Sequence, residues 1–313
     1  MENLLILTGP TGIGKTEISL ELAKKYKGEI ISSDSMQIYK KLDIGTAKVD
    51  LENTEIPHHM VDIIDPDKNF SVADFKYMAE EIISEINNRG GLPLVVGGTG
   101  LYINSLVYNL DFTETEADYA YREELNKILQ ERGSEFLYTK LYELNKDMAE
   151  KIHPNNGQRI IRALEILKDG NEKGNNFRQE NGDYNLIFIG LNMDRERLYE
   201  RINKRVDKMI ELGLVEEVKG LLDAGLDKGS QSLKAIGYKE VISYLDGEIE
   251  YDEMIELIKK NSRHYAKRQL TWFRRDNRIQ WFDRESDNLL KKIETYIDSK
   301  LDWGFRRKND NIR

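Results

Sequence analysis

NLLILTGPTGIGKTEISLELAKKY, residues 3–26, is the stretch of the chain that decides its fold. The apolar run Asn3–Thr8 predicts a buried strand, and Lys15–Tyr26 carries apolar residues at helical spacing. Between them, Gly9-Pro10-Thr11-Gly12-Ile13-Gly14-Lys15-Thr16 fits the phosphate-loop pattern G-x-x-x-x-G-K-[ST], in the strand–loop–helix context that the pattern requires. Glycines let backbone N–H groups curl around phosphate oxygens at a helix N-terminus, so the stretch predicts a phosphate-binding site.

Two side chains of this loop bring chemistry of their own. Lys15 supplies a mobile positive charge beside the phosphates, and the hydroxyl of Thr16 can ligate Mg²⁺. We therefore predict that Lys15 and Thr16 act in catalysis, with Mg²⁺ as the cofactor and Thr16 as its protein ligand.

The acid expected near a phosphate loop stands in an unusual place. Hydrolysing enzymes of this kind carry an acid after a neighbouring core strand, to hold Mg²⁺. The strand predicted over Leu92–Val96 ends instead in Gly97-Gly98-Thr99, whereas the strand predicted over Glu29–Asp34 ends in an acid. Because parallel strands end at one ligand-binding edge, we expect Asp34 to face the phosphates as a general base. The alternative is that Asp34 is only a turn or cap residue.

The rest of the chain alternates strands with helices up to about residue 112 and again after residue 184. Further strands are expected at Val61–Ile64, Asn185–Asn192 and Ile279–Phe282, and further helices at Ser71–Arg89, after Gly98, from Arg195 to about Gly225, from about Tyr251 to Phe273 and at Ser286–Leu301. This alternation predicts an α/β fold with a parallel, P-loop NTPase-like sheet. Residues 113–168 show no convincing strand and are rich in Glu, Leu, Lys and Tyr, and residues 169–183 are polar and glycine-rich, which predicts a loop. We therefore predict a core of residues 1–112 and 184–313, interrupted by an inserted helical domain at 113–183.

Composition limits the setting of the protein. The 313-residue chain is 39% hydrophobic, has a net charge of −9 and contains no cysteine. Disulfides and cysteine-ligated zinc are excluded, a cytoplasmic location is expected, and no apolar run is long enough to predict a membrane span.

Basic residues are confined to tracts: Lys259–Arg278 has eight of them and one acid, a local charge of +7. Together with Lys151–Arg162 and the tail from Gly304, this tract predicts local binding of a polyanion, with solvated helix faces as the alternative.

Six blocks of the sequence together resemble one enzyme family. They are ISSDSMQIYKKLDIGTAK at 31–48, PHH at 57–59, VGGTGLY at 96–102, RIIRALE at 159–165, GYKE at 237–240 and AKRQ at 266–269. In this order they resemble the tRNA dimethylallyltransferases, also called tRNA isopentenyltransferases. The chain has no cysteine for the C-terminal zinc finger of eukaryotic members, so it resembles the bacterial form.

The resemblance implies a reaction and its residues. Family members transfer a dimethylallyl group from dimethylallyl diphosphate to N6 of the adenine 3′ of the tRNA anticodon, with Mg²⁺, and their phosphate loop is also described as nucleotide-binding. Here the loop Gly9–Thr16 would hold the diphosphate, and Asp34 would be the base at the adenine amine. The implied tRNA contacts are Asp34, Ser35, Met36, Gln37, Thr99, Arg122, Gln158, Arg159, Ile160, Ile161 and Arg162. The family further implies the anticodon stem-loop as partner, and we expect a monomer.

Some features keep two interpretations. Arg201 and Arg205 lie four residues apart on a predicted helix, so we expect them to clamp the diphosphate; a solvated helix face is the alternative. The stretch HYAKRQLTWFRR would support the RNA backbone, although its Trp272 and Phe273 suit a core equally well. The function that competes with prenyl transfer is a P-loop small-molecule kinase, which would need lid arginines. A GTPase-like switch lacks its N-K-x-D segment here.

Overall fold

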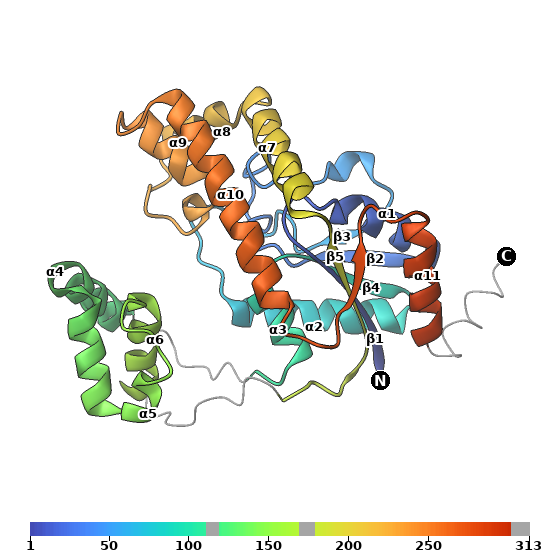
Figure 1. Ribbon diagram of the computed structural model, residues 1–313, viewed down its shortest axis with the longest axis horizontal. Helices are drawn as coiled ribbons and strands as arrows, with labels where there is room; N and C mark the ends of the chain where they lie inside the picture. Colours follow the sequence, from blue (N-terminus) through green and yellow to red (C-terminus); the bar gives the residue numbers. More distant parts are fainter. Residues whose placement is uncertain (111–118, 169–178, 302–313) are drawn as a thin grey trace. The chain divides into compact units, whose positions relative to one another are not determined.

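The computed structural model describes residues 1–110, 119–168 and 179–301, and it divides the chain into two units (Figure 1). One unit comprises Met1–Tyr108 and Glu180–Arg313, and the other comprises Asn109–Gln179. The sequence predicted the insertion at 113–183. Residues 180–183 instead belong with the core, where the backbone N–H of Asn181 donates to Val107 O at 3.1 Å and Glu180 pairs with Tyr108.

The larger unit is built on a parallel sheet. Its described strands are β1 (Glu2–Thr8), β2 (Gly28–Ser32), β3 (His58–His59), β4 (Leu92–Gly97), β5 (Tyr184–Asn192) and β6 (Gln280–Asp283). They are hydrogen-bonded in the order β3-β2-β4-β1-β5-β6, and every pair is parallel. The predicted P-loop NTPase-like α/β core is thereby confirmed, and all carboxyl ends of the strands meet at one edge.

Helices cover both faces of this sheet. Those of the larger unit are α1 (Lys15–Tyr26), α2 (Val72–Asn88), α3 (Gly100–Val107), α7 (Arg195–Glu211), α8 (Leu214–Asp223), α9 (Tyr238–Leu245), α10 (Tyr251–Phe273) and α11 (Leu289–Lys300), with short 3-10 turns η1 (Leu51–Asn53) and η2 (Ser232–Lys234). Side chains alternate across a strand, so the side chains of β1 pack into two hydrophobic cores, one on each face of the sheet. Leu5 packs with residues of α1 and α11, and Leu4 packs with residues of α2 and α3. A capping box between Ser71 and Asp74 begins α2, as its sequence predicted.

The structure corrects two of the predicted elements and adds one that was not predicted. The strand expected at Val61–Ile64 is wrong: β3 comes earlier, and left-handed backbone at Met60 (φ 61°) and Asp62 (φ 55°) prevents an extended run. The long helix expected after Arg195 is two helices, separated at Gly213 with φ 96°. Helix α9 was not predicted.

The described regular elements of the smaller unit are all helices, as its sequence predicted. It consists of α4 (Tyr119–Leu144), which is interrupted at Gly133 (φ 80°), α5 (Lys146–Ala149) and α6 (Gly157–Lys168). Its own core includes Leu125, Leu137, Ile160 and Leu164. The polar loop predicted at residues 169–183 and the basic tail from Gly304 lie mostly or wholly outside the described residues.

Candidate active site

The phosphate loop has the backbone that its glycines predict. Gly9, Gly12 and Gly14 have φ of 150°, 79° and 92°, which other residues rarely adopt. The buried Ile13 anchors the loop, and a side chain at Gly12 would stand 2.9 Å from Ile202 of α7. The glycines therefore give the loop its tight backbone, and α7 packs directly against it.

Lys15 stands at the start of α1 and turns back over this loop. Its ammonium donates to the carbonyl oxygens of Gly9 and Pro10 at 2.9 and 3.0 Å. Burial, together with the charge of Arg205, lowers the pKa of Lys15 to about 8, and the charge of Asp34 opposes the shift. The next residue, Thr16, presents an exposed side chain in the first turn of the helix. The protein offers the Lys15 ammonium two carbonyl acceptors and little compensating negative charge, so this cation is suited to bind an anionic ligand.

The two predicted clamp arginines of α7 play different parts. Arg205 is half-buried and donates to the carbonyl oxygen of Thr46 at 3.4 Å. Burial lowers the pKa of its guanidinium, and the charge of Asp34 opposes this. Arg201 is exposed, and its Nε donates to Gly12 O at 2.9 Å. Arg205 thus lies with Lys15 and Asp34, whereas Arg201 supports the phosphate loop from outside.

Asp34 follows β2 at the carboxyl edge of the sheet, where it forms a turn and also lies near the phosphate loop. Its Oδ1 accepts a hydrogen bond from the backbone N–H of Met36 at 2.9 Å, so it is a turn residue. Its half-buried carboxylate is also close enough to affect the pKa of Lys15, Arg205 and Tyr265. The structure therefore brings together the predicted base, the loop lysine and one predicted clamp arginine.

Ser35 and Thr99 join the two loops next to Asp34. The backbone N–H of Ser35 donates to Thr99 Oγ1 at 3.1 Å, and the N–H of Thr99 donates to Ser33 O at 3.2 Å. Two of the predicted tRNA contacts therefore stand side by side at the carboxyl edge.

The side chain of Gln37 forms two hydrogen bonds within the protein. Its Oε1 accepts a hydrogen bond from Ser32 Oγ at 2.9 Å, and its Nε2 donates to Thr46 O at 3.2 Å. Thr46 O also accepts from Arg205, so one carbonyl joins a predicted tRNA contact to a predicted phosphate clamp. The neighbouring Met36 is half-buried and packs against the core.

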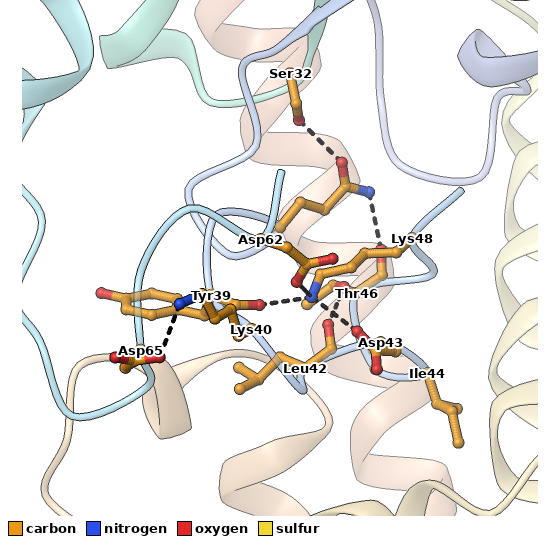
Figure 2. Close-up of polar contacts among 12 residues, drawn as sticks. Ser32, Tyr39, Lys40, Leu42, Asp43, Ile44, Thr46, Lys48, Asp62 and Asp65 are labelled. Carbon is orange, nitrogen blue, oxygen red and sulfur yellow. Dashed lines mark hydrogen bonds and ion pairs between the residues drawn. The ribbon is translucent and has the colours of Figure 1, made fainter. Parts of the chain in front are cut away.

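The loop that carries Thr46 is held by groups that the sequence did not single out. Lys48 donates to Tyr39 O at 2.5 Å and to Asp43 at 2.8 Å, and it also contacts Asp62 (Figure 2). On its other side, the Glu217 carboxylate accepts from the N–H groups of Asp43, Ile44 and Gly45 at 2.9, 2.8 and 3.2 Å. The hydroxyl of Tyr238 in the GYKE block donates to Glu217 at 2.6 Å.

Helix α10 supplies two further residues that the sequence did not assign. Gln269 is buried; its Oε1 accepts from the N–H of Thr11 at 2.8 Å, and its Nε2 donates to Gly98 O at 3.0 Å. Tyr265 is half-buried, and burial together with the Asp34 charge raises its pKa to about 12. Gln269 belongs to the AKRQ block, and a polar residue on the apolar face of a predicted helix was the signal that could have singled it out.

The basic tract at 259–278 is only partly available to a ligand. Lys259 pairs with Asp207 at 2.8 Å, Arg263 donates to Asn203 at 2.6 Å, and Arg278 pairs with Asp276 at 2.7 Å. The exposed basic residues of the tract are Lys260, Lys267, Arg268, Arg274 and Arg275. Phe273 is buried and Trp272 packs against the core, so the aromatic residues serve packing.

The tRNA contacts predicted in the smaller unit form a group of their own. Arg122 and Arg162 both pair with the buried Glu165, at 2.5 and 3.2 Å. Gln158 and Arg159 are exposed, whereas Ile160 and Ile161 are buried in the core of the unit. Apolar spacing on an amphipathic helix turns the side chains of Ile160 and Ile161 inward, and the RNA contacts expected at Gln158–Arg162 stay a prediction.

Three other residues at the strand ends take structural or supporting positions. His59 lies 2.7 Å from Glu29, and the ring of His58 contacts Ile56 O at 2.8 Å, so this pair ties down the edge strand. Arg284, which was not predicted, follows β6. A side-chain carbon built on Gly14 would lie 3.2 Å from Arg284 Nε and 3.2 Å from Arg201 Nη2, so both guanidinium groups lie next to the phosphate loop. Arg284 also pairs with Glu17.

No helix among the described residues is both long and apolar enough to cross a membrane.

Comparison with known proteins gives one consistent picture. Residues 37–276 match the IPP transferase family, and residues 2–56 match the isopentenyl transferase family. The chain is 47% identical over 306 residues to a tRNA dimethylallyltransferase of Acetivibrio thermocellus, covering 95% of this chain and 98% of that protein. It is 48% identical over 307 residues to one of Alkaliphilus metalliredigens, with the same coverage.

Solved structures agree with the sequence relatives. The full-length tRNA isopentenylpyrophosphate transferase of Bacillus halodurans superposes with a TM-score of 0.73 at 45% identity, covering 99% of each chain. A eukaryotic dimethylallyltransferase acting on tRNA superposes with a TM-score of 0.77 at 28% identity, covering 96% of this chain and 81% of the other.

Proposed function

The chain belongs to the IPP transferase family and is a tRNA dimethylallyltransferase, and we propose that its phosphate loop and Asp34 act on the two substrates from opposite sides. The reaction moves a dimethylallyl group from dimethylallyl diphosphate to N6 of the adenine on the 3′ side of the tRNA anticodon. The observation that carries the proposal is the position of Asp34 at the carboxyl edge, where its charge acts on both Lys15 and Arg205.

The phosphate side stabilises the leaving group. An allylic diphosphate ionises readily because the allyl cation is resonance-stabilised, so the main task is to hold the negative charge of the departing diphosphate. Backbone N–H groups at the start of α1, the ammonium of Lys15 and the guanidinium of Arg205 are suited to this. Lys15 would exchange its contacts with Gly9 O and Pro10 O for phosphate oxygens.

Asp34 takes the proton. The N6 amine of adenine is a poor nucleophile because its lone pair is delocalised into the ring, and it must lose a proton as it attacks. A carboxylate within hydrogen-bond reach can accept that proton. The turn between Asp34 and Met36 holds the carboxylate in place, and Tyr265 of α10 lies near enough for the Asp34 charge to raise its pKa.

Mg²⁺ would bind here mainly through the phosphates of the substrate, with few protein ligands. Among the described residues, no cluster of three His, Asp or Glu side chains stands ready to hold a metal. Mg²⁺ commonly binds through one or two protein oxygens and substrate phosphates, and the exposed Thr16 at the start of α1 is placed for that role. When bound, Mg²⁺ neutralises developing charge on the diphosphate.

The RNA partner that we propose is the anticodon stem-loop. The target base must leave its stack to enter a pocket, and bases of single-stranded loops leave most easily. Exposed Lys267, Arg268 and Arg274 on and after α10 would contact the phosphate backbone, and Gln158, Arg159 and Arg162 of the smaller unit would add contacts. We further propose that the protein is a cytoplasmic monomer.

A labelled transfer assay tests the function. The chain is incubated with dimethylallyl diphosphate labelled in the isoprenoid, an anticodon stem-loop RNA and Mg²⁺, with and without ATP, and the RNA is digested for thin-layer chromatography. We expect label on the adenine nucleotide whether or not ATP is present. Modification that requires ATP, or transfer of phosphate in place of the isoprenoid, would refute the proposal in favour of a kinase.

A further inference from the structure

The side-chain amide of Gln269 is buried between two loops of the active site. Only 5% of this residue is exposed, although glutamine is usually a surface residue. Its Oε1 accepts from the N–H of Thr11 in the phosphate loop at 2.8 Å, and its Nε2 donates to Gly98 O in the loop after β4 at 3.0 Å. One side chain thus joins two segments that are far apart in the sequence.

Both ends of the amide are needed for this contact. A side chain placed on Gly98 would stand 2.0 Å from Gln269 Nε2, so only glycine lets α10 approach so closely. Oε1 can only accept and Nε2 can only donate, which matches the N–H on one side and the carbonyl on the other. A hydrocarbon side chain of the same size would fill the space and make neither bond.

The two loops that Gln269 joins serve different substrates. Thr11 belongs to the loop that holds the diphosphate. Gly98 precedes Thr99, whose hydroxyl accepts from the N–H of Ser35 at 3.1 Å, and Ser35 follows Asp34. Two hydrogen bonds of Gln269, the peptide bond from Gly98 to Thr99 and the Thr99–Ser35 hydrogen bond therefore connect the phosphate loop to the residue beside the base.

We propose that Gln269 is a positioning residue that sets the separation between the diphosphate loop and the Asp34 loop, and thereby couples the binding of the two substrates. The inference rests on the proposed function, because it takes the two loops to hold the two substrates. Transfer requires the allylic carbon and the amine nitrogen to approach to about 3–3.5 Å in line, and a misplacement of about 1 Å can cost about 10²-fold in rate. A residue that bonds to both loops is placed to set this approach.

The test compares Gln269→Met with Gln280→Met. Methionine keeps the size of the side chain and removes both hydrogen bonds, while Gln280 is an exposed glutamine on β6 that controls for the same chemical change. Three quantities are measured on folded protein: the single-turnover rate constant at saturating substrates, the affinity for an anticodon stem-loop RNA, and the factor by which Mg²⁺ with inorganic diphosphate tightens that affinity. The factor is a coupling free energy between the two sites.

The inference predicts a specific pattern for Gln269→Met. The single-turnover rate falls by about 10²-fold, the factor falls toward one, and the affinity for RNA alone is unchanged. If Gln269→Met does not fold, Gln269→Glu carries the test: it keeps the acceptor for Thr11 but cannot donate to Gly98 O, so the factor should also fall.

Three results would separate failure of the inference from failure of the function. A Gln269→Met variant as active and as coupled as Gln280→Met refutes the role of Gln269 alone. Loss of stability and of RNA affinity with the coupling factor kept would make Gln269 a packing residue and also refute the inference. A wild-type chain that transfers no dimethylallyl group refutes the proposed function itself.

Discussion

Two lysines show how differently one chain holds a buried charge. Lys48, in the loop that carries Thr46, is 5% exposed and is surrounded by acceptors: Asp43, Asp62 and the carbonyl oxygen of Tyr39 (Figure 2). Lys15, in the phosphate loop, donates only to the carbonyl oxygens of Gly9 and Pro10, and within the described residues it makes no ion pair.

The difference distinguishes a structural cation from one that binds a ligand. Burial lowers the pKa of Lys15 to about 8, which means that the protein stabilises its charge poorly. Lys48 has carboxylate partners that offset its burial. Around Lys15 the cations outnumber their partners, since Arg205 also lies there and Asp34 is the carboxylate that opposes both shifts. An anionic substrate would restore the balance.

The largest expected effect comes from Asp34→Asn. The amide keeps the size of the side chain and can still accept the N–H of Met36, but it cannot take a proton from the adenine amine. We expect the single-turnover rate to fall by about 10²–10⁴-fold, with the affinities for RNA and diphosphate changed much less.

A Mg²⁺ titration of the same variant tests the competing role of Asp34 as a metal ligand. A rate defect that stays constant as Mg²⁺ rises supports the base. Partial recovery of the rate with excess Mg²⁺, together with weaker metal-dependent binding of diphosphate, would contradict it.

Lys15→Ala should reduce the rate by about 10²–10³-fold while the fold survives, because the side chain stabilises the leaving diphosphate and packs little. Lys15→Arg sharpens the test through pH. With its pKa at about 8, Lys15 loses its charge as pH rises through that value, so the wild-type affinity for diphosphate should fall above about pH 8. The arginine variant should show no such fall. Normal turnover by Lys15→Ala would refute the assignment of the phosphate loop.

The sequence pattern was enough to predict that Lys15 is a ligand-binding cation. Glycine spacing and a helix start specify a phosphate loop locally, and parallel strands place Asp34 at the same edge, so the amino-acid pattern alone predicts that Lys15 and Asp34 lie together. Lys48 and Gln269 could not be assigned a partner in this way. The partners of Gln269 lie 258 and 171 residues away in the sequence, and only the packed fold brings them together. Those of Lys48 lie 5 to 14 residues away, in an irregular loop whose path no sequence pattern specifies.

Lys48→Met tests whether Lys48 is a structural cation. It leaves Tyr39 O and two carboxylates without their shared donor, so we expect the free energy of unfolding to fall by roughly 1–3 kcal/mol, with a smaller change in rate than Lys15→Ala causes. Lys40→Met is the matched control: its pair with Asp65 is exposed and contributes about 0–1 kcal/mol. Chemical denaturation measures both. Equal losses in the two variants would mean that Lys48 is not a structural cation.

The smallest effect concerns cations that face solvent. Lys267, Arg268 and Arg274 are exposed, so neutralising two of them should weaken RNA binding without loss of stability. The slope of log affinity against log salt should flatten by about 0.7–0.9 for each RNA phosphate that the variant no longer neutralises. Lys259 serves as the control, because it is paired with Asp207. An unchanged slope for the exposed pair would make the α10 tract a solvated face.

The division of the site between Lys15 and Asp34 is tested most directly by isothermal titration calorimetry. Dimethylallyl diphosphate with Mg²⁺ is titrated into Lys15→Ala and into Asp34→Asn, each in the presence of an anticodon stem-loop RNA. If Lys15 holds the diphosphate and Asp34 serves the amine, Lys15→Ala loses most of its affinity for the diphosphate and Asp34→Asn binds it as the wild type does. Equal loss in both variants, or normal binding by Lys15→Ala, would contradict this division of the site.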